Sequence, residues 1–369
     1  MNFKDGTIKK DEEIMLRLRG LYHGYGYKPF KMSRFEEYDL YAKNKDFLVS
    51  GDILTFTDLN GKLLALKPDV TLSIIKNYKG GSGAYKVYYN ENVYRPDKGT
   101  HEFKEIMQSG VECIGNIGMY EECEVIRMAL QSLGLISESG NYILDIASAG
   151  MLNGLLEAAT ADESVKKLLA GMINAKNIHG LREVCAEYSV SGGTAETLVR
   201  LAEVSMTAFD DFSELKKLCI NREMSEACEN LINVTEILKK CGMAEHINID
   251  FSILSDINYY SGIVFRGYIE ELPKSILSGG RYDKLLARMG KKGGAAGFAI
   301  YADMLERLGS RSNASDCDAA IKYDSATAAA AILETVARLQ NDGKSVCVMR
   351  DIPTDYIFGE VIDMCGEGK

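Results

Sequence analysis

The spacing of apolar and polar residues along the chain predicts a mixture of helices and strands. Apolar residues recur at helix-compatible intervals over residues 11–25, at Ile14, Leu16, Leu18 and Leu21. Residues 53–66 contain two short apolar runs on either side of Asn60-Gly61. Both central residues of a tight type I′ turn need positive φ, which this pair favours, so we expect a β-hairpin there.

Tyrosine- and valine-rich segments follow at residues 85–94 and 105–115, separated by turn-forming residues at 96–99. We expect two antiparallel strands. The pattern returns to helical periodicity over residues 120–133 and to a strand over residues 142–147. This alternation predicts a sheet flanked by helices.

Residues 151–245 differ in composition from the rest of the chain, with long Ala, Leu, Glu and Lys runs and little clustering of β-branched residues. Such a composition favours helices, and the Ser-Gly-Gly sequence at residues 191–193 interrupts them. We therefore predict a helical insertion that forms a subdomain.

Strand patterns resume at residues 247–253 and 259–269, and we expect a helix to begin near Gly297. A Ser- and Asn-rich segment at residues 310–316 then predicts a linker.

The remaining residues predict a small α/β unit, with an alanine-rich helix at 325–340 and a strand at 345–349. We expect an α+β core over residues 1–310, built on an antiparallel sheet and interrupted by the insertion at about 151–245. Residues 311–369 would form the C-terminal α/β unit.

Composition and charge narrow the functional classes. With 369 residues, of which 46% are hydrophobic, the chain can bury one large core and one or two smaller ones. The 43 basic and 53 acidic residues give a net charge of −10, so composition offers no broad basic face for nucleic acid. Nine cysteines without a C-x-x-C pair, and only four histidines, lack the pattern of a zinc site. We expect no metal and no cofactor.

The segments that direct a protein to a membrane are also missing from the pattern. The first residues, MNFKDGTIKKDEE, are charged and contain no apolar signal-peptide core. No apolar run approaches the roughly 20 residues that span a bilayer. We expect a protein of the reducing cytoplasm that makes no membrane contact.

Polar residues cluster at three places inside the predicted strands. The first cluster contains Asp69, the second joins Arg95 to Glu112, and the third contains the adjacent Tyr259 and Tyr260. The two carboxylates would accept N–H groups while the guanidinium holds a carboxylate. Such an amphoteric pocket fits an amino acid.

A simpler interpretation of the same residues stays open at this point. Alternate residues of a strand point to solvent, so Gln108 and Glu112 are also consistent with an exposed face. Tyr259 and Tyr260 would then place one ring in the core and one in water.

Several segments resemble the class II aminoacyl-tRNA synthetases, and specifically the histidyl family. Residues 90–115 resemble motif 2, with its strand, arginine, variable loop and Q-x-G-x-E return strand. Residues 54–71 resemble the hairpin element that precedes motif 2, residues 254–265 the histidine signature with two tyrosines, and residues 278–300 motif 3. The order and spacing match over about residues 10–310.

The resemblance implies a pocket for histidine. Asp69, Thr71 and Gln108 would hold the α-amino end, with Asp69 in place of the usual Glu. Arg95 stands where the family's motif 2 arginine contacts the ligand carboxylate and, in true synthetases, the α-phosphate of ATP.

Three other residues match the family's contacts to the imidazole ring of histidine. The resemblance implies that Glu112, together with Tyr259 and Tyr260, encloses the ring.

The chain departs from the family where the family binds ATP. Ser255 and Met304 stand where the family has arginines, and Ile106 stands where it places an aromatic ring against adenine. Lys104 replaces a usual arginine, and Tyr301 fills a glycine position. Loss of one preorganised charge of this kind commonly costs about 10²–10³ in rate. We therefore expect no catalytic residues and no synthetase chemistry.

Two further departures concern assembly and tRNA. Ser33 replaces the motif 1 proline at the family's dimer interface, although a homodimer is still expected. The region after residue 310 is shorter than the family's anticodon-binding domain, which argues against tRNA binding.

A synthetase-like core that keeps the amino-acid pocket, lacks the ATP site and has a short C-terminal region resembles the regulatory subunits of ATP phosphoribosyltransferase. That enzyme catalyses the first step of histidine biosynthesis. The resemblance implies a non-catalytic subunit that a short catalytic chain requires for activity within a hetero-oligomer, and that contributes to histidine feedback. Linkage would supply the coupling, at typically about 1–3 kcal/mol.

Two other functions remain alternatives. One is a divergent histidyl-tRNA synthetase or other aminoacylating enzyme, which would exchange pyrophosphate in a histidine-dependent way. The other is a synthetase-like module that acts on a different protein or amino acid.

Overall fold

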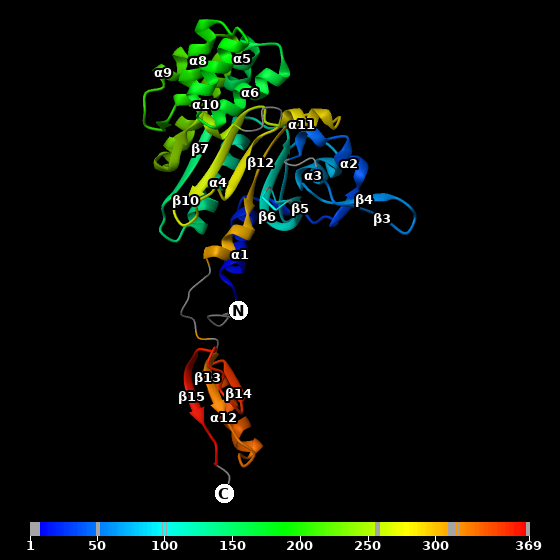
Figure 1. Cartoon of the computed structure of the whole chain (residues 1–369), viewed down its shortest axis with the longest axis vertical. Coiled ribbons are helices and arrows are strands. Elements are labelled where there is room, and N and C mark those ends of the chain that lie inside the picture. Colours follow the sequence, from blue (N-terminus) through cyan, green and yellow to red (C-terminus); the bar gives the residue numbers. More distant parts are fainter. Residues whose placement is uncertain are drawn as a thin grey trace. The chain divides into compact units, whose positions relative to one another are not determined.

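A computed structural model describes residues 8–48, 52–97, 99–100, 102–254, 259–308, 315 and 317–366. The chain divides into two units (Figure 1). Residues 11–308 form one, called the core unit here, and residues 1–10 and 309–369 form the other, called the C-terminal unit.

A large mixed sheet is the centre of the core unit, with nine strands among the described residues. Its order is β1 (Lys28–Pro29), β5 (Tyr85–Pro96), β6 (Phe103–Gly115), β12 (Gly294–Tyr301), β11 (Leu277–Arg281), β10 (Ile263–Ile269), β7 (Tyr142–Ser148), β9 (Ile247–Ile249) and β8 (Met206–Thr207). The pairs β1–β5 and β7–β9 are parallel and the other pairs are antiparallel.

Two long helices cover one face of this sheet, α1 (Lys10–Gly24) and α4 (Met119–Ile136). Leu18 and Tyr22 of α1 are fully buried, and the Tyr22 ring lies 6.0 Å from the Phe298 ring of β12. Because alternate residues of a strand point to opposite faces, Gly297, Ala299 and Tyr301 of β12 face away from these helices. A cavity lies on that second face.

A small antiparallel sheet and three short helices flank the β5 side of the large sheet (Figure 1). The sheet has the order β2 (Phe35–Glu37), β4 (Leu63–Leu66), β3 (Thr55–Thr57), and the helices are α2 (Tyr38–Ala42), α3 (Thr71–Asn77) and α11 (Asp283–Arg288). Short 3-10 helices occur at Lys45–Phe47, Ala244–His246, Phe251–Ile253 and Ala302–Leu308.

The residues between β7 and β9 are mainly helical and lie beyond one end of the sheet (Figure 1). The helices are α5 (Ala149–Ala159), α6 (Glu163–Asn174), α7 (Ile178–Glu187), α8 (Gly192–Glu203), α9 (Ser213–Lys217) and α10 (Arg222–Lys240). Side-chain caps begin several of them: Asp162 accepts from the backbone N–H groups of Ser164 and Val165, and Ser191 accepts from that of Thr194. The Ser-Gly-Gly break is thus the start of α8.

The C-terminal unit has a parallel three-stranded sheet in the order β14 (Val346–Met349), β13 (Cys317–Lys322), β15 (Phe358–Asp363). Helix α12 (Ala329–Asn341) contributes Leu339 to a small core with Ala319, Ile321 and Met364.

The predicted α+β class is confirmed, and the predicted strands at 85–94 and 105–115 pair antiparallel as β5 and β6. The helix predicted near Gly297 is wrong, because this residue lies inside β12, between β6 and β11. Nearly every residue of β12 is buried, so the strand has no polar alternation by which to recognise it.

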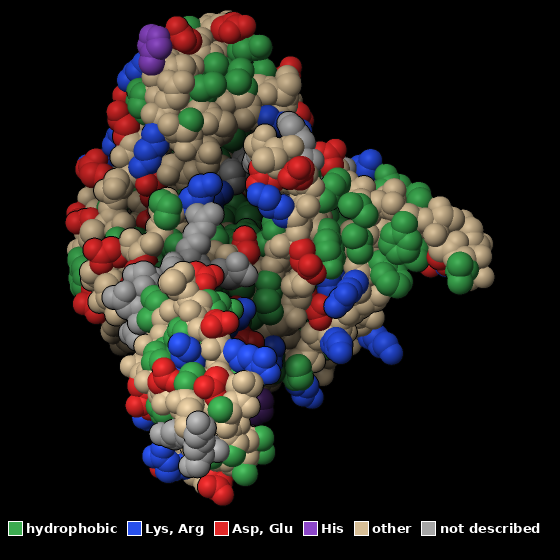
Figure 2. Space-filling view, turned by 60° about the horizontal axis from the view of Figure 1, so that its bottom comes forward, with side chains coloured by type: hydrophobic (Ala, Val, Ile, Leu, Met, Phe, Trp, Pro, Cys, Tyr) green, Lys and Arg blue, Asp and Glu red, His purple; other side chains and the backbone are tan. Residues whose placement is uncertain are grey.

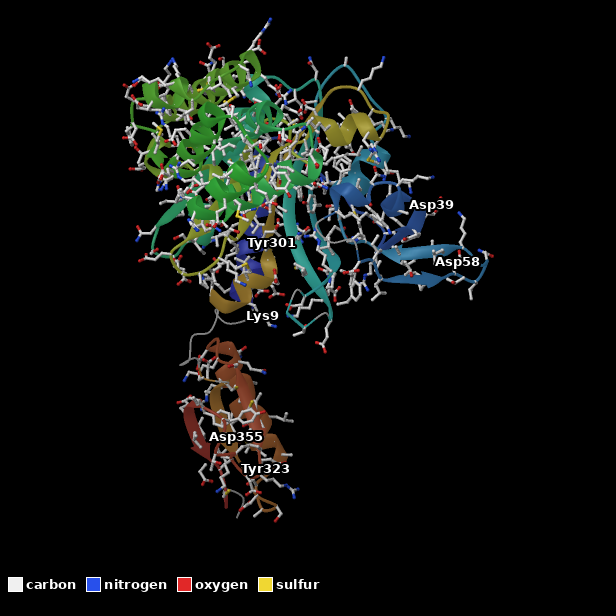
Figure 3. The ribbon with its side chains drawn as sticks, turned by 45° about the horizontal axis from the view of Figure 1, so that its top comes forward. Lys9, Asp39, Asp58, Tyr301, Tyr323 and Asp355 are labelled. Atoms are coloured by element: carbon white, nitrogen blue, oxygen red, sulfur yellow. The ribbon has the colours of Figure 1, made fainter. Side chains whose placement is uncertain are left out.

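The predicted hairpin forms from β3 and β4, but its type I′ turn is wrong. The loop between the last pair, Thr57 and Leu63, has five residues. The Asp58 carboxylate accepts from the N–H groups of Asn60 and Lys62, both at 2.8 Å, and in this loop only Gly61 has positive φ. The acidic side chain organises a longer turn, whose tip lies near Asp58 (Figure 3).

Within the described ranges of the chain, no helix combines the length and apolarity needed to cross a membrane.

The close packing of β11 on β12 gives a stability prediction. A Cβ added at Gly279 would overlap the carbonyl oxygen of Gly297 and the Cβ of Phe298. We expect Gly279→Ala to lower the free energy of unfolding by about 1–3 kcal/mol, as overpacked cores do. Chemical denaturation measures the change.

The matched control is Gly171→Ala on the exposed side of α6, where an added Cβ meets no atom within 4 Å. This change should stabilise the chain by about 0.5–1 kcal/mol, since alanine favours helix interiors. Equal effects of the two substitutions would contradict the described packing of β11 and β12.

Candidate functional site

A cavity of about 460 Å³ opens on the second face of the large sheet. It brings together all seven residues that the sequence singled out, Asp69, Thr71, Arg95, Gln108, Glu112, Tyr259 and Tyr260. They come from β5, β6, the first residue of α3 and the segments just before α3 and β10. The space-filling view shows a hollow on this face of the core unit (Figure 2).

Glu112 lies at the floor of the cavity and is only 2% exposed. Its Oε1 accepts a hydrogen bond from the Thr71 hydroxyl at 2.7 Å, and its Oε2 accepts one from the Tyr282 hydroxyl. A side chain on the neighbouring Gly297 would overlap this carboxylate, so the bare glycine makes room for it. Glu112 is therefore fixed in position from three sides.

Burial raises the pKa of Glu112 to about 8, because a charged carboxylate loses its hydration there. The hydrogen bonds from Tyr282 and Thr71 oppose this shift, and the nearby Asp69 adds to it. The carboxyl group is thus prepared either to donate a hydrogen bond or to become charged when a basic ligand binds.

Asp69 and Arg95 form a second polar group in the cavity wall. The Asp69 Oδ1 accepts from the backbone N–H of Leu72 at 2.8 Å, and its Oδ2 lies 3.8 Å from the Arg95 guanidinium. The Arg95 Nε donates to the carbonyl of Pro68 at 2.7 Å. Burial raises the pKa of Asp69, and Arg95 opposes that rise.

Aromatic rings enclose one side of the cavity. The Tyr259 and Tyr260 rings meet edge to face at 4.7 Å, and Tyr259 also lies 5.7 Å from Tyr282 and 6.3 Å from Phe47. Burial holds the pKa of Tyr259 well above its usual range, so its hydroxyl stays protonated. The rings form a wall that suits a flat, partly apolar group.

The segment that carries these two tyrosines is anchored to β11. The N–H of Ser261 donates to the Arg281 carbonyl at 2.8 Å, and the Ser261 hydroxyl accepts from the N–H of Asp283 at 2.9 Å. The Arg281 side chain is in turn paired with the buried Glu122 and with Asp283. These bonds fix the approach of the tyrosines to the cavity.

The exposed-face interpretation of β6 is wrong. Gln108 is 3% exposed and, like Glu112, lines the cavity. Sequence reasoning did not assign three tyrosines to this cavity, Tyr89, Tyr282 and Tyr301. Tyr282 stands inside the segment that resembles motif 3, which could have identified it, whereas no sequence signal distinguishes Tyr89 from its neighbours in β5.

Three of the residues that depart from the synthetase pattern are apolar or engaged elsewhere, whereas Tyr301 lines the cavity. Met304 packs against the main core and Ile106 against the smaller core around α3. Lys104 is exposed, and its ammonium group pairs with Asp97 at 2.6 Å. Ser255 and the side chain of Arg307 lie outside the described residues.

Over the described ranges, no group of three or more His, Cys, Asp or Glu side chains is placed to hold a metal ion.

Sequence comparison connects this chain to two related groups. Residues 3–305 match the family model described as histidyl-tRNA synthetase. A relative in Clostridium kluyveri is 32% identical over 84% of this chain and 80% of its own length, and one in Ruminiclostridium cellulolyticum is 29% identical over 80% and 71%. Both are named ATP phosphoribosyltransferase regulatory subunit.

Solved structures agree on the fold. A Bacillus halodurans protein described as an ATP phosphoribosyltransferase regulatory subunit/histidyl-tRNA synthetase superposes with a TM-score of 0.78 at 21% identity, covering 99% of this chain and 100% of that one. A chain of the ATP phosphoribosyl transferase complex from Thermotoga maritima gives a TM-score of 0.61 at 18% identity, covering 82% and 98%. The predicted class II synthetase-like fold is confirmed. By its match to the family model and its 32% identity to a named relative, the chain belongs to the ATP phosphoribosyltransferase regulatory subunits, a group with the histidyl-tRNA synthetase architecture.

Proposed function

We propose that the cavity binds free histidine and that the chain, as a non-catalytic subunit, activates a short ATP phosphoribosyltransferase chain and conveys histidine feedback to it. The observation that carries the proposal is the buried Glu112, held by Thr71 and Tyr282 beside Asp69. Two carboxylates, a guanidinium and an aromatic wall in one cavity complement the charges and the flat ring of histidine.

The imidazole would lie between Glu112 and the pair Tyr259–Tyr260. A carboxyl group whose pKa is about 8 takes part in a hydrogen bond with an imidazole nitrogen whichever of the two groups holds the proton. The α-amino group would approach Asp69 and Gln108, while Arg95 lies within reach of the α-carboxylate.

The same proposal includes loss of the adenylation reaction. Activation of an amino acid places charge on phosphate groups, which needs preorganised cations. Met304 and Ile106 offer apolar side chains packed on the protein, and Lys104 is paired with Asp97. The cavity would therefore bind an amino acid without activating it.

Histidine feedback follows from linkage. A ligand shifts an assembly toward an inactive state only if it binds that state more tightly, by typically about 1–3 kcal/mol. A catalytic partner for this chain is supported by the name that its relatives carry, regulatory subunit, and by its likeness to a chain of the Thermotoga maritima complex. A divergent synthetase is the second candidate, supported by the family model but not by the name that the curated relatives carry.

We also propose that the chain forms a homodimer inside the hetero-oligomer. The hairpin region carries the exposed apolar side chains Phe35, Phe56, Leu59 and Leu63 (Figure 2). Phe35 and Phe56 meet edge to face at 5.5 Å. Exposed apolar groups gathered in this way are typical of protein interfaces. A cytoplasmic location is part of the proposal, since all nine cysteines are free thiols.

The feedback role gives a prediction for Glu112→Gln. In a complex reconstituted with a short catalytic chain, this variant should raise the histidine concentration that inhibits by roughly 10- to 100-fold, because a hydrogen bond to a charged group contributes about 1.5–3 kcal/mol. The assay measures phosphoribosyl transfer to ATP at increasing histidine concentration.

The matched control is Glu105→Gln, at an exposed carboxylate of the same strand. Complexes with this control should respond to histidine as the parent does. The proposal fails if the parent chain does not activate the catalytic chain, or if Glu112→Gln leaves the response to histidine unchanged.

The pKa of Glu112 gives a prediction for stability. In the folded chain its carboxyl stays protonated up to about pH 8, whereas in the unfolded chain it ionises near its ordinary pKa of 4.5. The folded state binds more protons between these values, so this group lowers stability as pH rises. The ligand-free Glu112→Gln variant should gain melting temperature relative to the parent between about pH 5 and pH 8.

Thermal melts across this pH range measure the difference, with about 2–4 °C expected for each kcal/mol. The Glu105→Gln control should show no such gain, because hydrogen bonds from Tyr94 and Asn92 lower the pKa of Glu105. A gain for Glu112→Gln that is independent of pH would contradict a raised pKa.

A further inference from the structure

The helical insertion comprises residues 149–246 in the structure (Figure 1). Of the described residues that form the wall of the cavity, none belongs to it. We propose that Lys176 of the insertion is nevertheless a positioning residue for the cavity. It holds the segment that leads to Tyr259 and Tyr260, so that ligand binding and the attachment of the insertion to this segment stabilise each other. The inference deepens the proposed function, on which it rests for the identity of the ligand.

The corner of the insertion between α6 and α7 has an unusual backbone. Lys176, at this corner, has a φ of +49°, in the left-handed region that the Cβ atom of an L-residue disfavours. Glycine adopts the same conformation without that cost. The lysine side chain can therefore be removed by a glycine substitution without disturbing the turn.

The Lys176 side chain joins the insertion to the segment that follows β9. Its Nζ lies 2.6 Å from Oδ2 of Asp250. The other oxygen of this carboxylate accepts from the N–H of Ser252 at 2.8 Å and so caps the 3-10 helix Phe251–Ile253. The Asp250 N–H donates to the Ile146 carbonyl of β7 at 3.2 Å. One aspartate thus connects the corner, the 3-10 helix and the large sheet.

A second hydrogen bond joins the same corner to the same 3-10 helix. The side-chain amide of Asn174, the last residue of α6, donates to the carbonyl of Ser252. Phe251 and Ile253, on either side of this carbonyl, are buried, and Ile253 lines the cavity. The corner therefore fixes a helix that places one of its own side chains in the cavity wall.

The charge of Lys176 also acts on polar groups of the second face of the sheet. Asp145 of β7 lies opposite Arg266 of β10, which lines the cavity. Burial and the neighbouring Asp250 raise the pKa of Asp145 to about 6. A hydrogen bond with Asn248 and the charges of Lys176 and Arg266 oppose this rise. Lys176 is thus one of the cations that keep two neighbouring carboxylates charged.

The insertion is also linked to the chain that follows the two tyrosines. The Asn230 amide of α10 donates to Oε2 of the buried Glu122 at 3.5 Å. The other oxygen of Glu122 accepts from the N–H of Ile263, the first residue of β10, at 3.2 Å. Contacts of the insertion therefore precede Tyr259 and Tyr260 in the sequence, at the 3-10 helix, and also follow them, through Glu122.

These contacts give a physical route between the ligand and the insertion. A ligand that packs against the tyrosine wall favours one arrangement of the segment that carries it. The corner favours the same arrangement through Asn174 and Lys176. Because such coupling is reciprocal, the ligand must stabilise the attachment of the corner as much as the corner stabilises ligand binding.

Hydrogen exchange and isothermal titration of the full chain with histidine test this link. In the parent, saturating histidine should slow exchange of the backbone N–H groups of residues 174–181 by roughly 2- to 5-fold, although the insertion does not line the cavity. Lys176→Gly should abolish the slowing and weaken histidine binding by roughly 2- to 5-fold, the range for a partly exposed ion pair. Lys176→Arg, which keeps the charge, should restore both. Adding Asn174→Ala to the glycine variant should enlarge the loss to roughly 5- to 20-fold.

The matched control is Ser189→Gly. Ser189 is exposed at the corner between α7 and α8 and has a φ of +55°, so the substitution makes the same backbone change at the next corner of the insertion. It should leave both the slowing and the affinity as in the parent. Neither glycine substitution should lower the melting temperature, which separates loss of positioning from loss of folding.

The outcomes distinguish this inference from the proposed function. A parent chain that does not bind histidine overturns both. If the parent binds histidine, the inference alone is overturned when histidine does not slow exchange at residues 174–181. It is equally overturned when Lys176→Gly keeps the slowing and the affinity of the parent, or when Ser189→Gly loses them to the same extent.

Discussion

The site depends on one buried carboxylate. Glu112 belongs to β6, which lies between β5 and β12 in the large sheet. Its side chain fits there because Gly297, its partner in β12, has no side chain. Thr71 and Tyr282, which are distant in sequence, both donate to it. A buried acidic group costs stability unless it is hydrogen-bonded, and these two hydroxyl groups supply the bonds. The tyrosine wall, Asp69 and Arg95 are arranged around this group.

Much of the fold could be predicted from the sequence, because its elements differ in periodicity. Apolar residues recur at helical spacing in α4, the β5–β6 pair is rich in tyrosine and valine, and the caps of α6 and α8 are typical residues at typical positions. The seven proposed ligand-binding residues lie in segments that resemble a known family, and the cavity brings them together. Their role in binding histidine remains a proposal.

The wrong predictions for β12 and the hairpin turn, and the omission of Tyr89, have physical causes that act beyond the local sequence. β12 is buried on both faces, so its composition of Gly, Ala and Phe does not distinguish a strand from a helix. The Asp58 side chain, rather than the Asn-Gly pair alone, determines the hairpin loop. Tyr89 reaches the cavity because it pairs with Gly110, which has no side chain to block it, and such register is fixed only when the strands meet.

The central claim is that the cavity keeps an amino-acid site while the surroundings of a nucleotide are lost. The most direct test is calorimetric titration of the isolated chain with histidine, with alanine and with ATP, together with an assay of pyrophosphate exchange. The account predicts saturable binding of histidine, no binding of alanine, which lacks the ring that Glu112 and the tyrosines enclose, and no histidine-dependent exchange of pyrophosphate into ATP. Tight ATP binding with pyrophosphate exchange, or equal binding of alanine and histidine, would contradict it.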